Sequence, residues 1–374
     1  MNNPGRLNYN PGFVRRDPTP MTPLRSPRER MIAACRRGSV DRPPAWMMRQ
    51  AGRYLPEYRA LREGRSFLAM ARDPALASEL TLQPIRRFGM DAAVVFSDIL
   101  IPPAAMGAPL EFREGVGPVI DPPLRDAAAV DGLSGFDPEV ATGFLAETLR
   151  TVRAELGEER AIVGFSGAPF TVASYLVEGG GSRNWEHTRR MMLAAPELFE
   201  RLLARIVEAT IPYLAMQVAA GADVVQLFES WGGALDARTY RAAVLPHLTK
   251  LVAGARETGV PVIVYANGGG HLLEVFADSG ADVLSIDWRV DPTEAMARVG
   301  DRVALQGNLD PTVLFGPPAV VEREARAVLE AFAPQREGGY VFNLGSGILP
   351  KTPLESVEAL WRTVLHPSHA GSRP

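Results

Sequence analysis

Eight short apolar runs recur along this chain of 374 residues, and each ends in a polar or glycine-rich turn. The runs are rich in Val, Ile and Phe and do not alternate with polar residues, which is typical of parallel strands buried on both faces. Amphipathic stretches with helical spacing lie between them, among them 138–156, 196–219 and 237–258. The expected strands are 44–48, 92–96, 161–165, 224–228, 262–266, 283–286, 303–306 and 340–342.

Strands that alternate with helices in this way predict an α/β fold, a single (β/α)8 TIM-type barrel. A doubly wound open sheet is the alternative, but it would carry a G-x-G-x-x-G turn after its first strand, and the sequence has none there. We expect the barrel to span residues 28–366. The segment 1–27, rich in Pro, Asn and Arg, is expected to be a disordered N-terminal tail, and 367–374 a flexible C-terminal tail.

The overall charge and the cysteine content restrict the partners and the compartment of the protein. A net charge of −3 gives no bulk attraction to nucleic acid or to an anionic membrane, so we expect neither as a partner. The charge-free stretch 161–177 is broken by two glycines and a proline and is too short to span a bilayer. Cys35 is the single cysteine, so no disulfide can form within the chain, and a cytoplasmic location is expected.

Sequence motifs for a metal or an organic cofactor are missing. None of the five histidines has a spacing to another potential ligand that suggests a zinc or iron site. The sequence also has no Walker A loop and no G-x-S-x-G motif. We therefore expect neither a metal nor a cofactor.

Two arginines, Arg49 and Arg53, follow the first expected strand, with Gly52 and Pro56 close by. On a regular exposed helix, two like charges at this spacing repel, and glycine and proline also disfavour a helix. Guanidinium groups bind carboxylates and phosphates through paired hydrogen bonds, so the pair suits an anion site. The alternative is a surface turn with solvated arginines. All but two of the 40 basic residues are Arg, so their number alone carries no argument.

Polar residues follow the ends of all eight expected strands, where a barrel of this type forms its active-site mouth. Asn267 and Asp310 are better explained as helix caps. Asp98 is followed by an apolar, proline-containing segment that is a poor helix start, so its carboxylate has no obvious structural duty. The expected mouth residues are Arg49, Arg53, Ser97, Asp98, Ser166, Glu229, Ser230, Asn267, Asp287, Trp288, Asn308, Asp310, Asn343 and Ser346.

Several of these stretches resemble the uroporphyrinogen decarboxylase family, over roughly residues 42–362. The most specific motifs are PAWMMRQAGR at 44–53 and GFSGAPFT at 164–171, and FSDIL at 96–100 agrees with them. Two later stretches, LQGNLDP at 305–311 and NLG at 343–345, also match the family pattern. The resemblance implies a cofactor-free (β/α)8 barrel that forms a cytosolic homodimer. It also implies an enzyme of porphyrin and haem biosynthesis that removes the four acetate carboxyls of uroporphyrinogen III to give coproporphyrinogen III.

The resemblance also implies which residues bind the substrate. The family's arginine pair and the backbone between the two arginines correspond to Arg49, Gln50, Ala51, Gly52 and Arg53. The family's essential aspartate corresponds to Asp98, its cleft tyrosine to Tyr175, and its serine after the fourth strand to Ser230. Ser346 stands where the family has a histidine in an Asn-Leu-Gly-His-Gly stretch that is expected to bind a substrate carboxylate. A serine is shorter and uncharged, and is a weaker partner for an anion.

The chemistry of the reaction suggests a role for each catalytic candidate. A pyrrole can act as its own electron sink once the ring carbon beside the acetate arm is protonated, so no cofactor is needed. Arg49 and Arg53 would hold carboxylates, and one of them, or a water that it orders, is a candidate proton donor. Asp98, kept ionised by the neighbouring arginines, would face the positive charge that develops on the ring.

Two other functions are compatible with a barrel of this kind. A tetrapyrrole-binding relative with altered or no activity is suggested by Ser346, although Arg49, Asp98 and Tyr175 argue against it. A methyltransferase of the wider superfamily would resemble zinc enzymes with His and Cys ligands, and this sequence lacks that ligand spacing.

Overall fold

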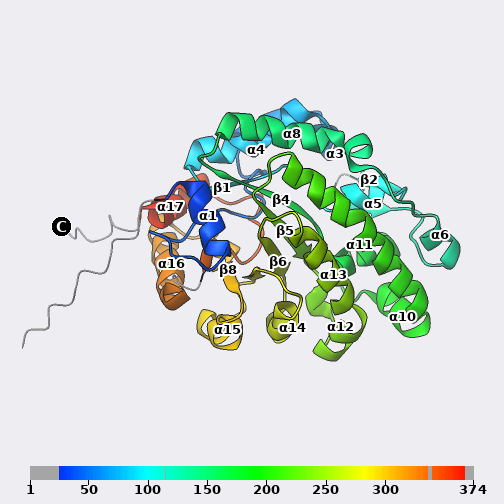
Figure 1. The fold of residues 1–374 in the computed structure, drawn as a ribbon. Coiled ribbons are helices and arrows are strands. Elements are labelled where there is room, and N and C mark those ends of the chain that lie inside the picture. The colour runs from blue at the N-terminus through cyan, green and yellow to red at the C-terminus, as the bar shows by residue number, and fades with distance from the viewer. Residues whose placement is uncertain (1–24, 114, 336–338, 367–374) are drawn as a thin grey trace, which may run out of the picture.

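The structure is a computed structural model that describes residues 25–113, 115–335 and 339–366. Its centre is a curled sheet in which every neighbouring pair of strands is parallel (Figure 1). The strand residues are almost all buried, as expected for a sheet that is covered on both faces. In spatial order the strands are β1 (Ala92–Val94), β4 (Ala161–Gly167), β5 (Val224–Glu229), β6 (Val262–Ala266), β7 (Val283–Ile286), β8 (Ala304–Leu309) and β9 (Tyr340–Leu344).

An irregular segment closes the ring between β9 and β1. Ala45 forms an isolated parallel bridge with Phe342, and the N–H of Phe342 donates to the carbonyl of Pro44 at 2.8 Å. On the other side, the N–H of Asp91 donates to the carbonyl of Ala45 at 2.9 Å. The barrel is therefore confirmed, but the expected strand 44–48 is wrong, because this stretch is a single bridge. Pro44 has no N–H to donate to a ladder, and the chain turns away just after Ala45.

A buried carboxylate holds this closing segment in place. Asp91, fully buried, accepts hydrogen bonds from the N–H of Ala45 at 2.9 Å and from Nη1 of Arg30 at 2.8 Å. The guanidinium of Arg42 donates to both oxygens of Asp91, at 2.7 and 3.0 Å. Asp41 pairs with Arg30 from the other side. This charge network replaces the regular ladder that the eighth strand would supply.

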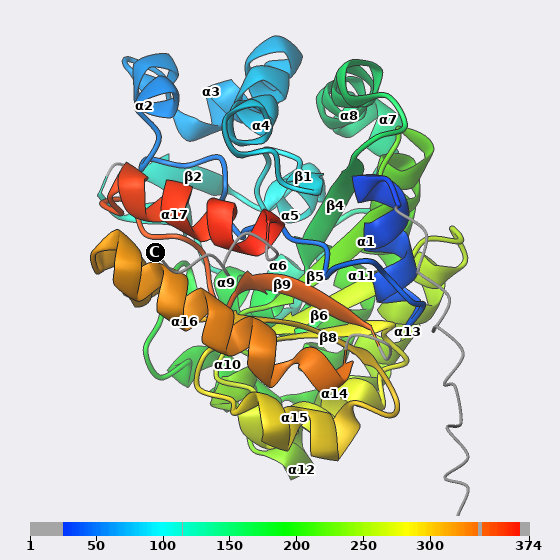
Figure 2. The ribbon, with the colours of Figure 1, turned by 90° about the vertical axis from the view of Figure 1, so that its left-hand side faces the viewer.

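The helices surround the sheet, and α16 and α17 run beside each other over β8 and β9 (Figure 2). The 196–219 helix is found with the expected bounds, whereas 138–156 and 237–258 each divide into two helices. Helices of the outer layer include α1 (Pro27–Cys35), α4 (Pro74–Phe88), α8 (Gly143–Leu156), α11 (Pro196–Ala219), α13 (Leu245–Arg256), α15 (Pro292–Val299), α16 (Pro318–Ala331) and α17 (Leu354–Leu365). The other helices are α2 (Pro56–Arg62), α3 (Phe67–Arg72), α5 (Ile101–Ala105), α6 (Ala127–Asp131), α7 (Pro138–Ala141), α9 (Pro169–Glu178), α10 (Glu186–Ala194), α12 (Ala237–Ala243) and α14 (Leu273–Ala277).

Two features of the helical layer bear on earlier expectations. Helix α11 is long and apolar enough to cross a membrane by length and composition, but 56% of its apolar stretch is buried, and it packs against α9, α13 and β4. Helix α1 begins at Pro27, where Ser26 and Glu29 form a capping box. Most of the N-terminal segment predicted as disordered, residues 1–24, lies outside the described residues, as does 367–374.

A small antiparallel hairpin, β2 (Leu110–Arg113) with β3 (Gly117–Ile120), was not expected from the sequence. Phe112 of this hairpin stacks on Phe67 of α3, with ring centroids 5.1 Å apart.

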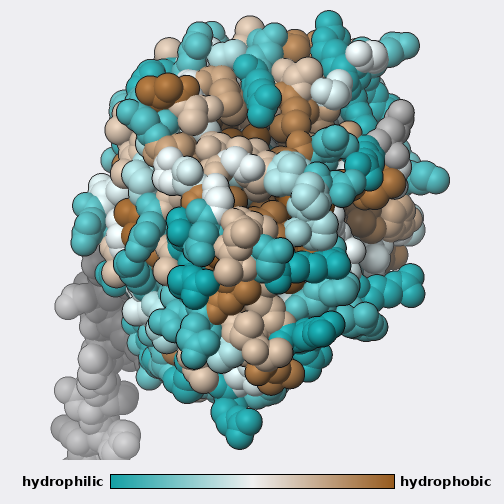
Figure 3. Space-filling model, turned by 90° about the vertical axis from the view of Figure 1, so that its right-hand side faces the viewer, coloured by the Kyte–Doolittle hydropathy of each residue, from teal (hydrophilic) through white to brown (hydrophobic). Residues whose placement is uncertain are grey.

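The face of the molecule on the right of Figure 1 is mainly hydrophilic, with apolar residues in separate small groups (Figure 3). The large apolar side chains that are exposed, Val116, Val140, Leu193 and Phe315, likewise lie on separate elements.

Candidate functional site

Arg49 is directed outward by a turn that is fixed to both neighbouring strands. The N–H of Met48 donates to Oδ1 of Asn343 on β9 at 3.1 Å. The buried side chain of Gln50 accepts from the N–H of Met47 at 3.2 Å and donates to the carbonyl of Ala92 on β1, also at 3.2 Å. Between these two buried anchors, Arg49 itself is exposed and has a left-handed backbone, with φ of 61°. The turn therefore fixes the backbone of Arg49 and leaves its side chain at the surface.

The Arg49 side chain passes over the loop that follows β9. A Cβ built on Gly347 would lie 2.5 Å from Cδ and 2.9 Å from Cγ of Arg49, so only a glycine leaves room for the side chain there. Gly347 directly follows Ser346, which is half-buried. The structure thus brings Arg49 and Ser346, which are far apart in sequence, to the same side of the mouth.

Asp98 lies after β1 and has a structural contact that the sequence did not suggest. Its Oδ1 accepts the N–H of Leu100 at 2.9 Å, in the turn that leads into α5. Burial raises the pKa of the Asp98 carboxyl, against the opposing effects of the Leu100 N–H and of the positive charge of Arg49. Arg49 thus lowers this pKa as expected, but the net shift is upward because the loss of solvation outweighs the attraction. The positive charge of Arg49 acts on this carboxyl, so the two side chains lie within electrostatic reach of each other.

Tyr175 joins the same group from α9. Its ring packs against that of Trp231 in a tilted arrangement, with centroids 4.1 Å apart and an angle of 31° between the planes. Burial and the negative charge of Asp98 raise the pKa of Tyr175 to about 12, against the positive charge of Arg49. The three side chains Arg49, Asp98 and Tyr175 therefore lie within electrostatic reach of one another.

A buried glutamate supports the aromatic side of the site. Oε1 of Glu229 accepts from the N–H and the hydroxyl of Thr171, at 2.9 and 2.6 Å, and Oε2 accepts from the hydroxyl of Tyr240 at 3.1 Å. The Thr171 hydroxyl in turn accepts the N–H of Trp231 at 3.1 Å. Burial raises the pKa of Glu229 to about 7, against these hydrogen bonds. Glu229, expected at the mouth, thus ties α9 to the end of β5, and half-buried Ser230 follows it.

Tyr265 at the end of β6 was missed by the sequence reasoning. It is buried, and its hydroxyl donates to the carbonyl of Gly345 at 3.2 Å, beside Ser346. Burial raises the pKa of Tyr265 to about 12, against a hydrogen bond with Ser346 and the positive charges of Arg49 and Arg289. The residue lay inside an expected strand and was therefore assigned to the core, and nothing in its sequence neighbourhood shows that its hydroxyl reaches the mouth.

Three other residues that follow the expected strands do not belong to the group of Arg49, Asp98 and Tyr175. Arg53 is exposed, and its positive charge acts on Tyr58. Gly52 is required by the turn, because a Cβ there would lie 2.9 Å from the carbonyl oxygen of Arg49. Asp310 accepts from the N–H and the hydroxyl of Thr312, both at 2.8 Å, which confirms the helix-cap interpretation for this residue.

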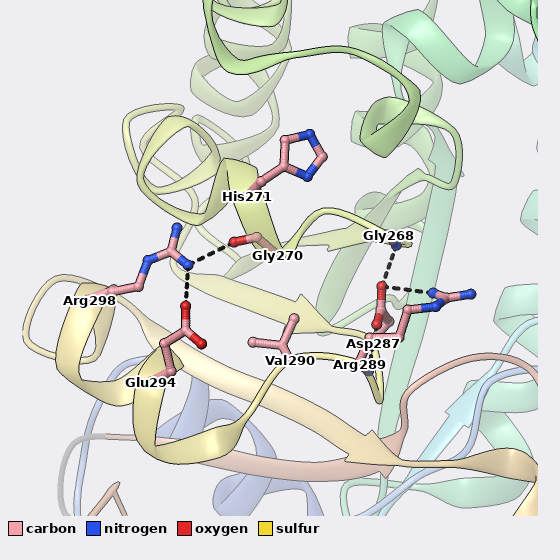
Figure 4. Close-up of a pocket in the computed structure, with 8 residues that line it drawn as sticks. All are labelled: Gly268, Gly270, His271, Asp287, Arg289, Val290, Glu294 and Arg298. Atoms are coloured by element: carbon pink, nitrogen blue, oxygen red, sulfur yellow. Dashed lines mark hydrogen bonds and ion pairs between the residues drawn. The ribbon is translucent and has the colours of Figure 1, made fainter.

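A cavity of about 460 Å³ opens at the ends of β6 and β7 (Figure 4). Buried Asp287 borders it and accepts hydrogen bonds from the N–H groups of Gly268 and Arg289. Arg49, Asp98 and Tyr265 do not line this cavity. Among the described residues, no group of three or more His, Cys, Asp or Glu side chains could hold a metal ion. The cavity is lined by Gly268, Gly270, His271, Asp287, Arg289, Val290, Glu294 and Arg298.

Solved structures with a similar fold include a methyltransferase and a methionine synthase. A methyltransferase from Methanosarcina mazei has a TM-score of 0.76 and 24% identity, and the match covers 90% of this chain and 97% of that one. A B12-independent methionine synthase from a Shewanella species has a TM-score of 0.53 and 12% identity, with 79% and 89% covered. At these identities the likeness shows the fold alone.

Sequence relatives are much closer. Proteins named uroporphyrinogen decarboxylase include one from Sorangium cellulosum, 48% identical over 332 residues, which cover 89% of this chain and 94% of that protein. Another, from Alkalilimnicola ehrlichii, is 47% identical over 337 residues, with 89% and 92% covered. The family model described as "Uroporphyrinogen decarboxylase (URO-D)" matches residues 26–366. The chain therefore belongs to the uroporphyrinogen decarboxylase family.

Proposed function

We propose that this protein is a carboxy-lyase that removes the four acetate carboxyls of uroporphyrinogen III and gives coproporphyrinogen III, in porphyrin and haem biosynthesis. The family and its near relatives support this reaction. The single structural observation that carries the proposal is that Arg49, Asp98 and Tyr175 lie within electrostatic reach of one another after the strands of the barrel. A cation suited to carboxylates is thus combined with an anion that can stabilise a ring cation.

Substrate binding falls to the turn that contains Arg49, Gln50, Ala51, Gly52 and Arg53. The two arginines offer planar donors suited to the carboxylate arms of a porphyrinogen. Gln50 contributes through the position of the backbone, since its side chain holds the turn to β1. Ser230 and Ser346 are half-buried near this mouth and can offer hydroxyl groups to the same ligand.

Asp98 is the group proposed to stabilise the transition state. Loss of CO2 from an acetate arm requires the pyrrole to be protonated first, so that the ring is a transient cation that accepts the electrons. A poorly solvated carboxylate interacts more strongly with such a cation than a hydrated one, because the local dielectric constant is lower. The burial that raises the pKa of Asp98 is thus consistent with this role. The proton itself comes from Arg49, Arg53 or a water molecule that they order.

We further propose that the enzyme acts in the cytoplasm as a homodimer, without a cofactor and without nucleic acid or a membrane as partner. The net charge of −3 and the single, buried Cys35 support the compartment and the lack of anionic partners. The homodimer rests on family resemblance. The proposed domain layout is a single barrel over 28–366 with tails on either side.

One assay tests the proposed reaction. The purified protein is incubated with uroporphyrinogen III under anaerobic, reducing conditions, and the products are oxidised and separated by the number of carboxyl groups. Stepwise appearance of intermediates that end in coproporphyrinogen is expected. Tight binding of the tetrapyrrole without any loss of carboxyl groups would instead indicate a non-catalytic binding protein.

A further inference from the structure

The loop after β9 connects the Arg49 site with the end of β7. Gly347 lies under the Arg49 side chain, as described above. Two residues earlier, a Cβ on Gly345 would collide with the backbone N of Trp288 and lie 3.0 Å from the backbone carbon of Asp287. The side of the mouth that contains Ser346 is therefore continuous with the backbone that carries Arg289.

Tyr265 lies at the junction of these two regions. Its hydroxyl donates to the carbonyl of Gly345 at 3.2 Å. The positive charges of Arg49 and Arg289 both act on this hydroxyl. One phenol group is thus within electrostatic reach of both arginines, although they follow strands on different parts of the barrel.

The side chain of Arg289 contacts neighbouring residues on one side and is exposed to solvent on the other. Its Nη1 donates to Oδ1 of Asn267 at 3.2 Å and lies 3.2 Å from Oδ2 of Asp287. Its guanidinium carbon lies 4.0 Å from the centroid of the Trp288 ring. The side chain nevertheless remains 53% exposed. Figure 4 shows the guanidinium beside Asp287 and Gly268, away from Glu294 and Arg298.

A second arginine of the cavity provides a contrast. Arg298 is paired with both Glu274 and Glu294, also donates to the carbonyl of Gly270, and is 26% exposed. Arg289 has one acidic partner, Asp287, whose oxygens also accept the backbone N–H groups of Gly268 and of Arg289 itself. A guanidinium has five N–H donors, so Arg289 keeps donor capacity for a ligand.

We propose that Arg289 forms a second carboxylate-binding subsite at the mouth, together with the hydroxyl group of Ser346, while Tyr265 holds the loop that carries Ser346. The ligand is an aliphatic carboxylate arm of the tetrapyrrole whose reacting ring lies on Arg49 and Asp98, so the inference rests on the proposed function. A porphyrinogen carries such arms around its whole edge and needs cations on more than one side of the mouth. Because Ser346 is uncharged, Arg289 supplies the positive charge on this side.

Steady-state kinetics with uroporphyrinogen III test the subsite. Arg289→Gln is expected to raise KM about tenfold and to leave kcat within about threefold, because the arm is bound equally in the ground and transition states. Arg289→Lys keeps the charge without the planar fork and is expected to recover part of the affinity. Arg323→Gln is the matched control, because Arg323 lies on outer helix α16, is 69% exposed and pairs with its neighbour Glu324.

Two further measurements separate the possible failures. Equal thermal midpoints for the variants and the wild type establish that a change in KM is not caused by unfolding. Equilibrium dialysis with coproporphyrinogen, which retains propionate arms, measures the subsite without turnover and should show about tenfold weaker binding by Arg289→Gln. If both KM and this affinity match those of Arg323→Gln, the subsite is wrong. If the wild type binds tetrapyrrole but releases no CO2, the proposed function fails while dialysis still decides the subsite.

Discussion

The side chain of Arg49 crosses Gly347 so closely that a Cβ at position 347 would lie 2.5 Å from Arg49 Cδ. The backbone of Gly347 does not have a positive φ, so an alanine there meets a steric conflict and no backbone strain. The contact sets the direction of the arginine that lies beside Asp98. It also gives a way to displace that arginine without changing its charge.

Gly347→Ala is expected to fold normally and to lose at least about tenfold in kcat/KM, because a flexible side chain moves more easily than the barrel wall. A displacement of about 1 Å in a positioning group can cost on the order of a hundredfold in rate. The assay is turnover of uroporphyrinogen III together with the thermal midpoint. Gly135→Ala is the control, since a Cβ at that position meets no atom within 4 Å. Equal activity of the two variants would show that the contact does not position Arg49.

The charge network around Asp91 is expected to dominate the stability of the barrel closure. Asp91→Ala leaves the buried guanidinium of Arg30 and that of Arg42 without their shared carboxylate, which costs about 3–5 kcal/mol for a buried ion pair. Thermal or urea unfolding measures the loss. Glu139→Gln is the control, because Glu139 pairs with Arg150 at an exposed position and such pairs contribute about 1 kcal/mol or less. Similar losses in both variants would contradict the assigned role of Asp91.

Glu229 is expected to make stability depend on pH in a defined direction. Its pKa rises from 4.5 to about 7 on folding, so the folded state binds the proton more tightly than the unfolded chain. The contribution of Glu229 to the free energy of unfolding is therefore fully present below about pH 4.5 and is lost as the pH rises through about 7. This contribution is on the order of 3 kcal/mol.

Glu229→Gln removes this titration and keeps an acceptor for Thr171. Unfolding of the wild type and of the variant is measured between pH 5 and 8, a range that covers most of the interval between the two pKa values and extends above it. The variant should gain stability relative to the wild type as the pH rises. A constant difference over this range would show that folding does not raise the pKa of Glu229.

Helix 196–219 and strand 262–266 were predicted with both bounds, because periodicity and a proline or a turn mark their ends. The prediction of a strand at 44–48 followed the apolar composition of this stretch. It gave too little weight to Pro44, which has no N–H for the hydrogen-bond ladder of a strand. The hairpin 110–120 has strands of four residues, too short for periodicity to be distinctive.

Within the site, strand-end position and family motifs identified Arg49, Asp98 and Tyr175. They could not show that the carboxylate of Glu229 accepts hydrogen bonds from Thr171 and Tyr240, because these residues lie on other elements of the fold. The same limit applies to the pKa of Asp98, whose direction depends on burial that only the folded protein defines. Tyr265 and the backbone next to Arg289 contact the loop after β9. These contacts join distant parts of the chain, so no local sequence pattern predicts them.

The role of Asp98 as the charge that stabilises the ring cation is tested most directly by the turnover of Asp98→Asn with uroporphyrinogen III. Asparagine has nearly the same shape and keeps an oxygen for the N–H of Leu100, so the variant should fold with an unchanged thermal midpoint. Asp137→Asn, at an exposed helix cap where asparagine is also favoured, is the control. We predict a loss of at least about a hundredfold in kcat for Asp98→Asn and none for the control. Near-normal turnover by Asp98→Asn would contradict the proposed mechanism.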